Sequence, residues 1–424
     1  MVDQVNGCVS FSLYGDGAKY AQGMVENVPL VQKYYPGWQC RVYLERGHYA
    51  KAALLKAGAR VIDMEPLPGS GGMFWRLFAA DDPQFTHVIF RDADSRVNPR
   101  EVACVEAWIT SGKTLHVIRD HPAHLSKPIM GGAWGMLSGG LRMRDAVDNW
   151  SHNYQYGDDE DFLWRVVWEK FRAIGDFVTH SFAPSDYLEV RVPEHTEYDG
   201  FVCEQIEATL SLPGTVASVV LSPEHYKDRR DNFFASLRQN GGELLNSKTI
   251  WVKGSDARTR ILPRHFPHVE SLPHYYWASR DHIDILENHY LQGVDYLFVF
   301  EDDASFRSDF EEHLMRALIA VPDGWMGIQL GGQSWSDSKR SYYIQDGEIA
   351  FPAALARVNG CLGMHGVLWN RRGMLRAWNH FHFHHLTTVD QAFVTLQKEE
   401  PHFYSASRWV VEIDSTAVQF GGDR

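Results

Sequence analysis

Two apolar runs, one in each half of the chain, end in a cluster of carboxylates. Val88-Ile89-Phe90 is followed closely by Asp92-Ala93-Asp94, and residues 296–300 lead directly into Glu301-Asp302-Asp303. Each run has the length and composition of a buried strand, and carboxylates crowded at a strand end repel one another unless a cation joins them. Oxygen ligands of this kind suit Mg²⁺ or Mn²⁺ better than Zn²⁺. The repetition predicts two domains built on one plan, each with a divalent-cation site.

Predicted strands and helices alternate along both halves of the chain. In the first half we expect strands at residues 5–13, 39–44, 60–64 and 88–90 and helices at residues 21–35, 49–57 and 73–80. In the second half we expect strands at residues 216–221, 249–253 and 296–300 and helices at residues 229–240, 279–290 and 309–320. This alternation predicts an α/β fold in which each domain has a mostly parallel sheet covered by helices.

Length and charge limit what the chain can be. Its 424 residues exceed what one core usually serves, and Leu212-Pro213-Gly214 lies where the alternation restarts, so we expect domains at residues 1–212 and 213–424. A net charge of -13 disfavours a broad nucleic-acid-binding surface but leaves a local basic groove open. No stretch is apolar enough for a membrane span and the first residues lack the pattern of a signal peptide, so we expect a cytoplasmic protein.

Five segments of the first half occur in a recognisable order. They are the run 73–82, the motif Asp92-Ala93-Asp94, the small-residue stretch 129–135, the acidic stretch 157–162 and Thr179-His180-Ser181. This order resembles the core of GT-A-fold glycosyltransferases, especially those of family 8, which includes glycogenin and bacterial galactosyltransferases. The resemblance covers roughly residues 8–200.

The resemblance implies roles for several residues. Asp92, Asp94 and His180 would hold Mn²⁺ or Mg²⁺ on the diphosphate of a nucleotide sugar, because a cation stabilises the charge that builds up on the departing diphosphate. Asp159 and Asp161 would be catalytic. Donor contacts are expected from the end of the first strand and from the nearest cations, namely Phe11, Leu13, Tyr14, Arg76 and Arg91.

Structural alternatives to these roles stay open. Aspartates at strand ends often cap turns, and an arginine beside acids is often only an ion-pair partner. His180 could be a buried structural histidine. Glu160 stands where family 8 prefers glutamine, which leaves the role of that position open. Asp120-His121 is a further polar pair that could contact substrate or form a turn.

The second half carries a different set of motifs. They are Val219-Val220-Leu221, Asp228-Arg229-Arg230, the strand ending in Glu301-Asp302-Asp303, the small-residue stretches 325–332 and 361–373, and Thr388-Val389-Asp390-Gln391. This set resembles glycosyltransferase family 25, which contains lipopolysaccharide and collagen galactosyltransferases. The resemblance implies a metal held by Glu301 and Asp303, donor contacts from Leu221 and Arg229, and Asp390 as the general base of an inverting reaction.

The run His380-Phe381-His382-Phe383-His384-His385 permits two arrangements. In a strand, His380, His382 and His384 would share one face, whereas a helix would pair His380 with His384. A zinc site and a role in packing or acceptor contact are both open.

Together the motifs predict a bifunctional, metal-dependent glycosyltransferase that moves sugars from nucleotide-sugar donors, expected to be UDP-sugars, to hydroxyl acceptors in successive steps of glycan synthesis. By resemblance, the first domain would retain and the second would invert the anomeric configuration. Three alternatives stay open: one active domain with an inactive acceptor-binding domain, a metal-dependent phosphoryl-transfer enzyme, and a non-catalytic carbohydrate-binding protein. The acceptor is equally open and includes a hydroxymethylated DNA base.

Overall fold

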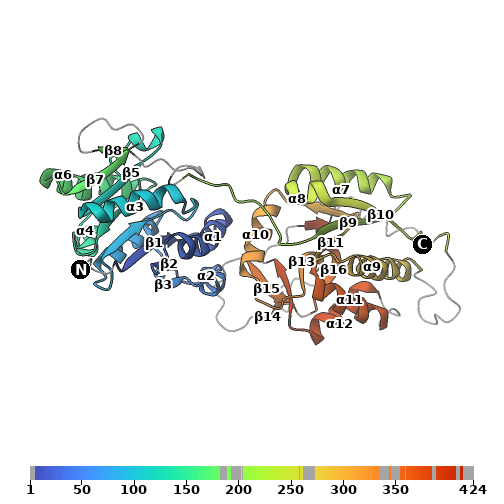
Figure 1. Ribbon diagram of the computed structural model, residues 1–424. Coiled ribbons are helices and arrows are strands. Elements are labelled where there is room, and N and C mark those ends of the chain that lie inside the picture. The colour runs from blue at the N-terminus through green and yellow to red at the C-terminus, as the bar shows by residue number, and fades with distance from the viewer. Residues whose placement is uncertain are drawn as a thin grey trace. The chain divides into compact units, whose positions relative to one another are not determined.

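The chain divides into two compact units, Met1–Ala208 and Thr209–Arg424, which we call unit 1 and unit 2 (Figure 1). The division falls near Leu212-Pro213-Gly214, where the sequence predicts the domain boundary. Each unit has its own eight-stranded sheet. The computed structural model describes residues 5–181, 189–191, 202, 204–256, 258–260, 273–333, 343–344, 354–358, 360–383, 388–406 and 411–413.

The sheet of unit 1 has the strand order β3-β2-β1-β4-β6-β5-β7-β8. Its strands are β1 (Gly7–Leu13), β2 (Gln39–Glu45), β3 (Arg60–Met64), β4 (His87–Phe90), β5 (Leu115–Arg119), β6 (Trp134–Leu137), β7 (Phe177–Ser181) and β8 (Glu189–Arg191). Strand β6 runs against the other seven described strands of this sheet. The expected α/β fold with a mostly parallel sheet is therefore confirmed for unit 1.

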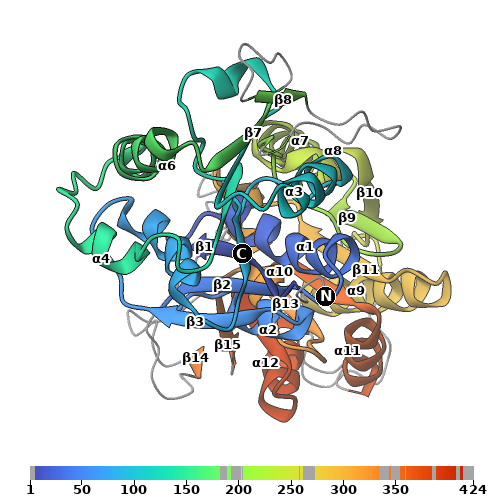
Figure 2. The same cartoon turned by 60° about the vertical axis from the view of Figure 1, so that its left-hand side comes forward.

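Helices lie on both sides of this sheet (Figure 2). They are α1 (Ala18–Tyr34), α2 (Lys51–Ala57), the 3₁₀ helices η1 (Gly71–Asp81) and η2 (Pro122–Leu125), α3 (Pro99–Ser111), α4 (Met143–Asp148), α5 (Asp158–Phe162), the π-helical η3 (Leu163–Trp168) and α6 (Glu169–Ile174). Helix α3 begins where Asn98 accepts a hydrogen bond from the Glu101 N–H at 3.1 Å, with Pro99 in its first turn. The helix expected at 73–80 is η1.

Strand β1 lies where the winding of unit 1 changes direction. Strands β2 and β3 follow on one side of β1, whereas β4 pairs with β1 in parallel on the other side. In open α/β sheets, ligands bind at the carboxyl ends of the strands at such a switch point. Tyr14 follows β1 and Asp92-Ala93-Asp94 lies just beyond β4. The topology therefore brings these two segments to the same edge.

Strand β1 is buried along its whole length, which requires cover on both faces of the sheet. On one face, Ser10 and Ser12 point toward η1. Ser10 Oγ donates to the Arg76 carbonyl oxygen at 2.7 Å, and Ser12 Oγ accepts from the Arg76 N–H at 2.9 Å. Trp75 and Phe90 belong to the hydrophobic core beside them. These buried contacts hold η1, and with it Arg76, against the first strand.

The sheet of unit 2 has the strand order β10-β9-β11-β16-β13-β17-β15-β14, and β12 and β18 form a separate pair. The strands are β9 (Val216–Pro223), β10 (Thr249–Gly254), β11 (Tyr296–Glu301), β12 (Ala304–Phe306), β13 (Gly327–Gln333), β14 (Tyr343–Ile344), β15 (Leu355–Val358), β16 (Leu362–Asn370), β17 (Phe403–Ala406) and β18 (Val411–Ile413). Strands β15 and β16 run against the other six described strands of the large sheet, so it too is mostly parallel, as expected.

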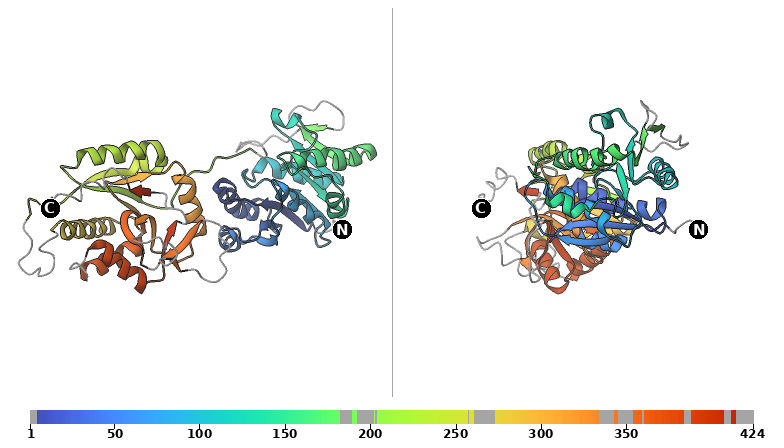
Figure 3. Two further views of the ribbon diagram at one scale, coloured as in Figure 1. Left: turned by 180° about the vertical axis from the view of Figure 1, so that it is seen from behind. Right: turned by 90° about the vertical axis from the view of Figure 1, so that its left-hand side faces the viewer.

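Two layers of helices enclose the sheet of unit 2. The helices are α7 (Lys227–Asn240), α8 (Gly242–Lys248), α9 (Pro273–Leu291), α10 (Phe310–Ala320), α11 (Arg371–Phe383) and α12 (Val389–Glu399). Figures 1 and 3 show α7 and α8 on one face and α9, α11 and α12 on the other. No helix in the described part of either unit is long and apolar enough to cross a membrane.

Unit 2 repeats the switch point of unit 1. Its first strand, β9, pairs in parallel with β10 on one side and with β11 on the other. Strand β11 ends at Glu301, at the carboxyl edge of the sheet. On its other side β11 pairs with the antiparallel strand β16, in a register that sets Phe300 opposite Gly366. One further step along this register places Glu301 opposite His365.

Candidate functional site

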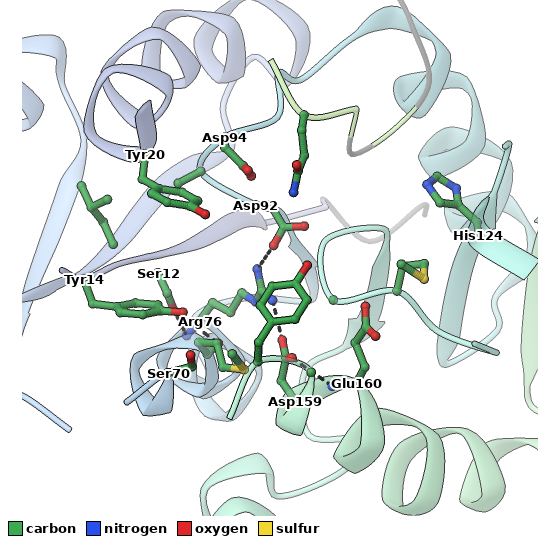
Figure 4. A pocket seen from close by; sticks show the side chains of 18 residues that line it. Ser12, Tyr14, Tyr20, Ser70, Arg76, Asp92, Asp94, His124, Asp159 and Glu160 are labelled. Carbon is green, nitrogen blue, oxygen red and sulfur yellow. Dashed lines mark hydrogen bonds and ion pairs between the residues drawn. The ribbon is translucent and has the colours of Figure 1, made fainter. Parts of the chain in front are cut away.

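A cleft of about 350 Å³ opens at the carboxyl ends of β1 and β4 in unit 1 (Figure 4). Its lining is mainly polar and aromatic and comprises Ser12, Leu13, Tyr14, Tyr20, Ser70, Met73, Arg76, Asp92, Ala93, Asp94, His124, Met130, Gly131, Tyr156, Gly157, Asp159, Glu160 and Gln205. Six residues that the sequence predicts as site residues are thus brought together here: Leu13, Tyr14, Arg76, Asp92, Asp94 and Asp159.

Arg76 joins two acidic residues inside this cleft. Its Nη1 contacts Asp92 Oδ1, its Nη2 lies 2.8 Å from Asp159 Oδ2, and its side chain is buried. Burial raises the pKa of the Asp159 carboxyl, and the nearby Arg76 opposes this shift. Figure 4 shows the guanidinium between the two carboxylates. A guanidinium held in this way is a fixed positive charge at the switch point of the sheet.

Gly131 makes room for this arrangement. A Cβ atom at position 131 would lie 2.8 Å from Arg76 Nη2 and 3.0 Å from Asp159 Oδ2, closer than ordinary contacts allow. Gly131 belongs to the small-residue stretch 129–135, just before β6. The small residue at this position therefore allows the backbone to approach the ion pair closely.

Asp92 and Asp94 differ in their exposure. The side chain of Asp92 is 36% exposed, whereas that of Asp94 is 6% exposed, with its Oδ2 3.7 Å from Lys19 Nζ. Burial raises the pKa of Asp94, and the charge of Asp92 adds to this shift while Lys19 opposes it. Asp94 Oδ2 has no hydrogen-bond partner in the described part of unit 1. A buried carboxylate oxygen that accepts no hydrogen bond and lies beside a second carboxylate fits a hard divalent cation.

Four residues predicted to act at this site do not line the cleft, namely Phe11, Arg91, His180 and Asp161, the last of which is described below. Phe11 is buried within β1. Arg91 Nε lies 3.1 Å from Glu101 Oε2, and both side chains are buried. His180, in β7, places its Nδ1 3.1 Å from His116 Nε2, and burial lowers the pKa of His180 to about 4. The contacts of Arg91 and His180 are those of the structural alternatives that the sequence leaves open.

The acidic stretch at the start of α5 is divided between the cleft and its surroundings. Asp159 and Glu160 line the cleft. Asp158 is buried and accepts a hydrogen bond from Trp150 Nε1 at 2.9 Å. Asp161, predicted to be catalytic, is 40% exposed and contacts Lys127, whose hydrogen bond lowers the pKa of Asp161. The structure thus places Asp159, but not Asp161, in the cleft.

In unit 2, Glu301, Asp303 and His365 form a group that suits a metal ion. One ligand atom from each residue lies within 4.8 Å of the others, and no second group of this kind occurs among the residues that the structure describes. His365 Nδ1 lies 3.2 Å from Glu301 Oε2 and 3.4 Å from Asp303 Oδ1. Carboxylates suit Mg²⁺ and Mn²⁺, and the imidazole shifts the preference toward transition metals. The donor set therefore fits Mn²⁺ better than Mg²⁺.

His365 reaches this group from β16, far along the chain from β11. The sequence reasoning placed it in a small-residue stretch and assigned it no role. The antiparallel register of β11 and β16 sets it opposite Glu301, and the turn between β11 and β12 carries Asp303. The sequence signal that could have identified His365 as a candidate ligand was a single histidine among small residues in a predicted strand.

His282 is a second residue that the sequence reasoning missed. It lies on α9 with a buried side chain, and its Nε2 is 3.4 Å from Glu301 Oε1. Burial works to raise the pKa of Glu301, but hydrogen bonds with His282 and His365 outweigh it and hold that pKa well below its usual range. Burial works in the opposite sense on His365, whose pKa is raised to about 10 by Asp303 and Glu301. Glu301 and His365 thus stabilise each other's charged forms.

Arg229, predicted to contact the donor, lies beside this group. Its Nη2 is 2.7 Å from Asp302 Oδ1 and 3.1 Å from Asp303 Oδ2, and its guanidinium lies 4.9 Å from the ring centre of Tyr226. Ser222 Oγ donates to the other oxygen of Asp302. Burial raises the pKa of Asp302 to about 6, although Arg229 and Ser222 oppose the shift. Asp302 therefore anchors Arg229 and the end of β9, while Asp303 belongs to the metal group.

Asp390 lies in the first turn of α12, where its Oδ1 accepts a hydrogen bond from the Gly363 N–H at 3.1 Å. Burial, and then the charge of Glu301, raise the pKa of Asp390 to about 6. Leu221, predicted to contact the donor, pairs with Glu301 in the register of β9 and β11, and its side chain packs in the core.

The histidine run is helical as far as the structure describes it. His380 and His382 lie on α11, and His380 Nδ1 is 3.4 Å from Glu399 Oε2. The strand arrangement is therefore not formed by residues 380–383. His384 and His385 lie outside the described residues.

No family model and no curated protein matches the sequence of this chain. Among solved structures, it is similar to a glycosyltransferase involved in glycosylation of the major capsid of PBCV-1, with 15% identity over 42% of this chain and 82% of that one, and a TM-score of 0.29. The chain is also similar to glucosyl-3-phosphoglycerate synthase from Mycobacterium tuberculosis in complex with Mn²⁺, UDP and glucosyl-3-phosphoglycerate. The two share 15% identity over 46% of this chain and 73% of that one, with a TM-score of 0.31.

A third similar structure is 4-diphosphocytidyl-2C-methyl-D-erythritol synthase from Anaerococcus prevotii, with 9% identity over 44% of this chain and 92% of that one, and a TM-score of 0.29. At such identities and TM-scores, the similarities carry no argument about what this chain binds or does. That argument rests on its own residues.

Proposed function

We propose that the chain is a bifunctional, metal-dependent glycosyltransferase that takes sugars from nucleotide-sugar donors, in particular UDP-sugars, and transfers them to hydroxyl acceptors in successive steps of glycan synthesis. One observation carries this proposal. Each unit places carboxylates at the carboxyl end of the parallel strand beside its first strand, at the switch point of its sheet. They are Asp92 and Asp94 in unit 1 and Glu301 and Asp303 in unit 2.

Both sites offer positive charge where a departing nucleoside diphosphate needs it. Asp92 and Asp94 would hold Mn²⁺ or Mg²⁺ in unit 1, and Glu301, Asp303 and His365 would hold Mn²⁺ in unit 2. The metal would neutralise the charge that accumulates on the leaving diphosphate. In addition, each site has a guanidinium held by ion pairs. In unit 1 it is that of the buried Arg76, and in unit 2 it is that of Arg229, which lies over the ring of Tyr226.

Asp390 is the candidate general base of unit 2. With a pKa raised to about 6, it keeps appreciable proton affinity near neutral pH while remaining largely ionised there. Its hydrogen bond from Gly363 and its place in the first turn of α12 fix the carboxylate where the charges of Glu301 and His365 act on it. A base that deprotonates the acceptor while the sugar's leaving group departs gives inversion at the anomeric centre in unit 2.

The test is a screen of UDP-sugars for Mn²⁺-dependent release of UDP by the full chain. Asp92→Asn/Asp94→Asn should abolish the use of one donor, and Glu301→Gln/Asp303→Asn should abolish the use of another, each by more than about 100-fold. Asp145→Asn, at an exposed position on α4, serves as a matched control and should leave both activities intact. Equal release of UDP by all four proteins would contradict the two-site proposal.

One feature favours a second candidate function, in which unit 2 alone transfers sugar and unit 1 binds the acceptor. The acids of unit 1 are already paired with Arg76 and Lys19, and three ligand atoms within 4.8 Å of one another are found, among the described residues, in unit 2. In that case Asp92→Asn/Asp94→Asn would raise the KM for the acceptor and leave UDP release in its absence unchanged.

The convergence of His282 and His365 on Glu301 also suits a metal-dependent phosphoryl-transfer enzyme. That activity would release phosphate from a phosphomonoester or cleave a phosphodiester in the presence of Mn²⁺ without any nucleotide sugar. Assays with p-nitrophenyl phosphate and bis-p-nitrophenyl phosphate separate this candidate from sugar transfer, and Glu301→Gln/Asp303→Asn identifies the unit responsible.

A further inference from the structure

A histidine and a buried aspartate meet at the wall of the unit 1 cleft. His124 lines the cleft, and its Nδ1 lies 3.3 Å from Asp120 Oδ1. The side chain of Asp120 is 0% exposed and that of His124 is 4% exposed. In the view of Figure 4, His124 lies across the cleft from Tyr14, with Asp92 between them. Neither member of this pair is among the residues that the sequence assigns to catalysis.

Several contacts orient Asp120 independently of the histidine. Asp120 directly follows β5, and its Oδ2 accepts a hydrogen bond from the Val202 N–H at 2.9 Å and lies 3.3 Å from Arg100 Nη1. The other oxygen, Oδ1, lies 3.3 Å from Nδ1 of His124 on η2, close enough for an ion pair but without the alignment of a hydrogen bond in this structure. The polar pair Asp120-His121 is now explained: Asp120 is a buried anchor, and His121 Nδ1 caps the turn by accepting from the Ala123 N–H at 3.2 Å.

Asp159, the residue in the cleft that the sequence predicts to be catalytic, already has partners for its carboxylate. Asp159 directs Oδ2 to Arg76 at 2.8 Å and accepts the Glu160 N–H on Oδ1 at 3.0 Å. Both of its oxygens therefore already accept hydrogen bonds. A histidine whose Nδ1 faces a carboxylate keeps its proton on that nitrogen and presents Nε2 as a proton acceptor. Of these two candidates, the histidine has the arrangement that proton transfer requires.

We propose that His124, positioned by Asp120, is the general base of unit 1. This inference rests on the glycosyl transfer proposed above. His124 Nε2 takes the proton of the acceptor hydroxyl, and the oxygen uses its electron pair to bond to the anomeric carbon. The bond from that carbon to the diphosphate oxygen breaks, and its electron pair leaves with the nucleoside diphosphate, beside Arg76. Attack from the side opposite the leaving group inverts the configuration, in contrast to the retention that the family 8 resemblance implies.

The parent protein for this experiment is the full chain carrying Glu301→Gln/Asp303→Asn, in which unit 2 is expected to be inactive. The donors are UDP-glucose and UDP-galactose, Mn²⁺ is present, and water is the acceptor. His124→Gln should lower the rate of donor hydrolysis by roughly 100-fold or more, the contribution typical of a general base. The affinity for UDP, measured by calorimetry, should stay within twofold. The hydrolysed sugar, observed by ¹H NMR before mutarotation, should be the β-anomer.

His121→Asn is the matched control, because it changes the neighbouring histidine of the same turn and keeps an acceptor for the Ala123 N–H. The rate of donor hydrolysis by His121→Asn should stay within twofold of the rate of the parent. Asp120→Asn should slow hydrolysis about tenfold or more in the parent but cause no further loss when combined with His124→Gln, because Asp120 acts through His124. If Asp120→Asn slows hydrolysis by the same factor with and without His124→Gln, Asp120 does not act through His124. Its role would then be purely structural, and that part of the proposal would be wrong.

Two results distinguish the ways in which this could fail. If the parent hydrolyses donor but His124→Gln keeps at least half of its rate, or if the released sugar is the α-anomer, the inference about His124 is wrong and sugar transfer by unit 1 stands. If the parent neither binds UDP nor hydrolyses either donor, sugar transfer by unit 1 is itself wrong, and the role of His124 is wrong with it.

Discussion

At the scale of single residues, position 131 decides how closely the backbone approaches the buried pair of Arg76 and Asp159. Gly131→Ala would bring a methyl group to 2.8 Å from Arg76 Nη2. The guanidinium must then shift, so we expect the UDP release that depends on Asp92 and Asp94 to fall at least tenfold and the unfolding free energy of unit 1 to fall by about 1–3 kcal/mol. Steady-state assays and thermal denaturation measure the two effects. Turnover equal to that of the parent would show that catalysis tolerates a displaced guanidinium.

The buried pair of His116 and His180 makes unit 1 sensitive to acid. Burial lowers the pKa of His180 to about 4, from about 6.5 in an unfolded chain, and lowers that of His116 as well. Between these two pH values the unfolded chain binds protons that the folded chain does not. The unfolding free energy of unit 1 is therefore unaffected by the titration of His180 above pH 6.5. It falls by up to about 3 kcal/mol as the pH decreases from 6.5 toward 4.

Denaturant unfolding of unit 1 at a series of pH values checks this prediction. His180→Gln should flatten the dependence of the unfolding free energy on pH between 6.5 and 4, even if it lowers stability at neutral pH. An unchanged slope in the variant would mean that other groups, and not His180, cause the sensitivity to acid.

At the scale of elements, the start of α12 determines where Asp390 lies. Thr388 is the N-cap of this helix, and its side chain accepts a hydrogen bond from the Gln391 N–H at 3.2 Å. Thr388→Ala should cost about 1 kcal/mol of unfolding free energy and lower the turnover of unit 2, because the first helical turn carries Asp390. Thr388→Ser keeps the cap and should restore both quantities. Urea denaturation and UDP release report them, and equal effects of alanine and serine would contradict a capping role.

The elements also show what could be predicted from sequence and what could not. The acids at the ends of β4 and β11 were predictable, because an apolar run followed by carboxylates is a local pattern. His365 and His282 were not, because they reach Glu301 from β16 and α9 through strand register and helix packing that no short stretch of sequence encodes. His180 was assigned by its order in the chain, yet β7 places it against His116. The fold class followed from the alternation of strands and helices alone.

At the scale of the whole molecule, each unit has its own sheet and core, so the two units should respond separately to metal. We expect calorimetry to resolve two unfolding transitions. Mn²⁺ should raise the transition of unit 2 by several degrees, since a ligand at 100 times its Kd adds about 2.7 kcal/mol of stability, and EDTA should reverse the shift. His365→Ala should weaken this response without altering unit 1. A shift that survives in the variant would assign the metal to other residues.

Arg76 pairs with Asp92 and Asp159, and Arg229 pairs with Asp302 and Asp303, so each arginine orients part of the acidic group at its site. If the two sites bind metal and donor as proposed, these ion pairs would keep the carboxylates oriented both before the ligands arrive and after they leave. The side chains would then need little rearrangement between turnovers, and the metal could enter with the nucleotide sugar and leave with the spent diphosphate.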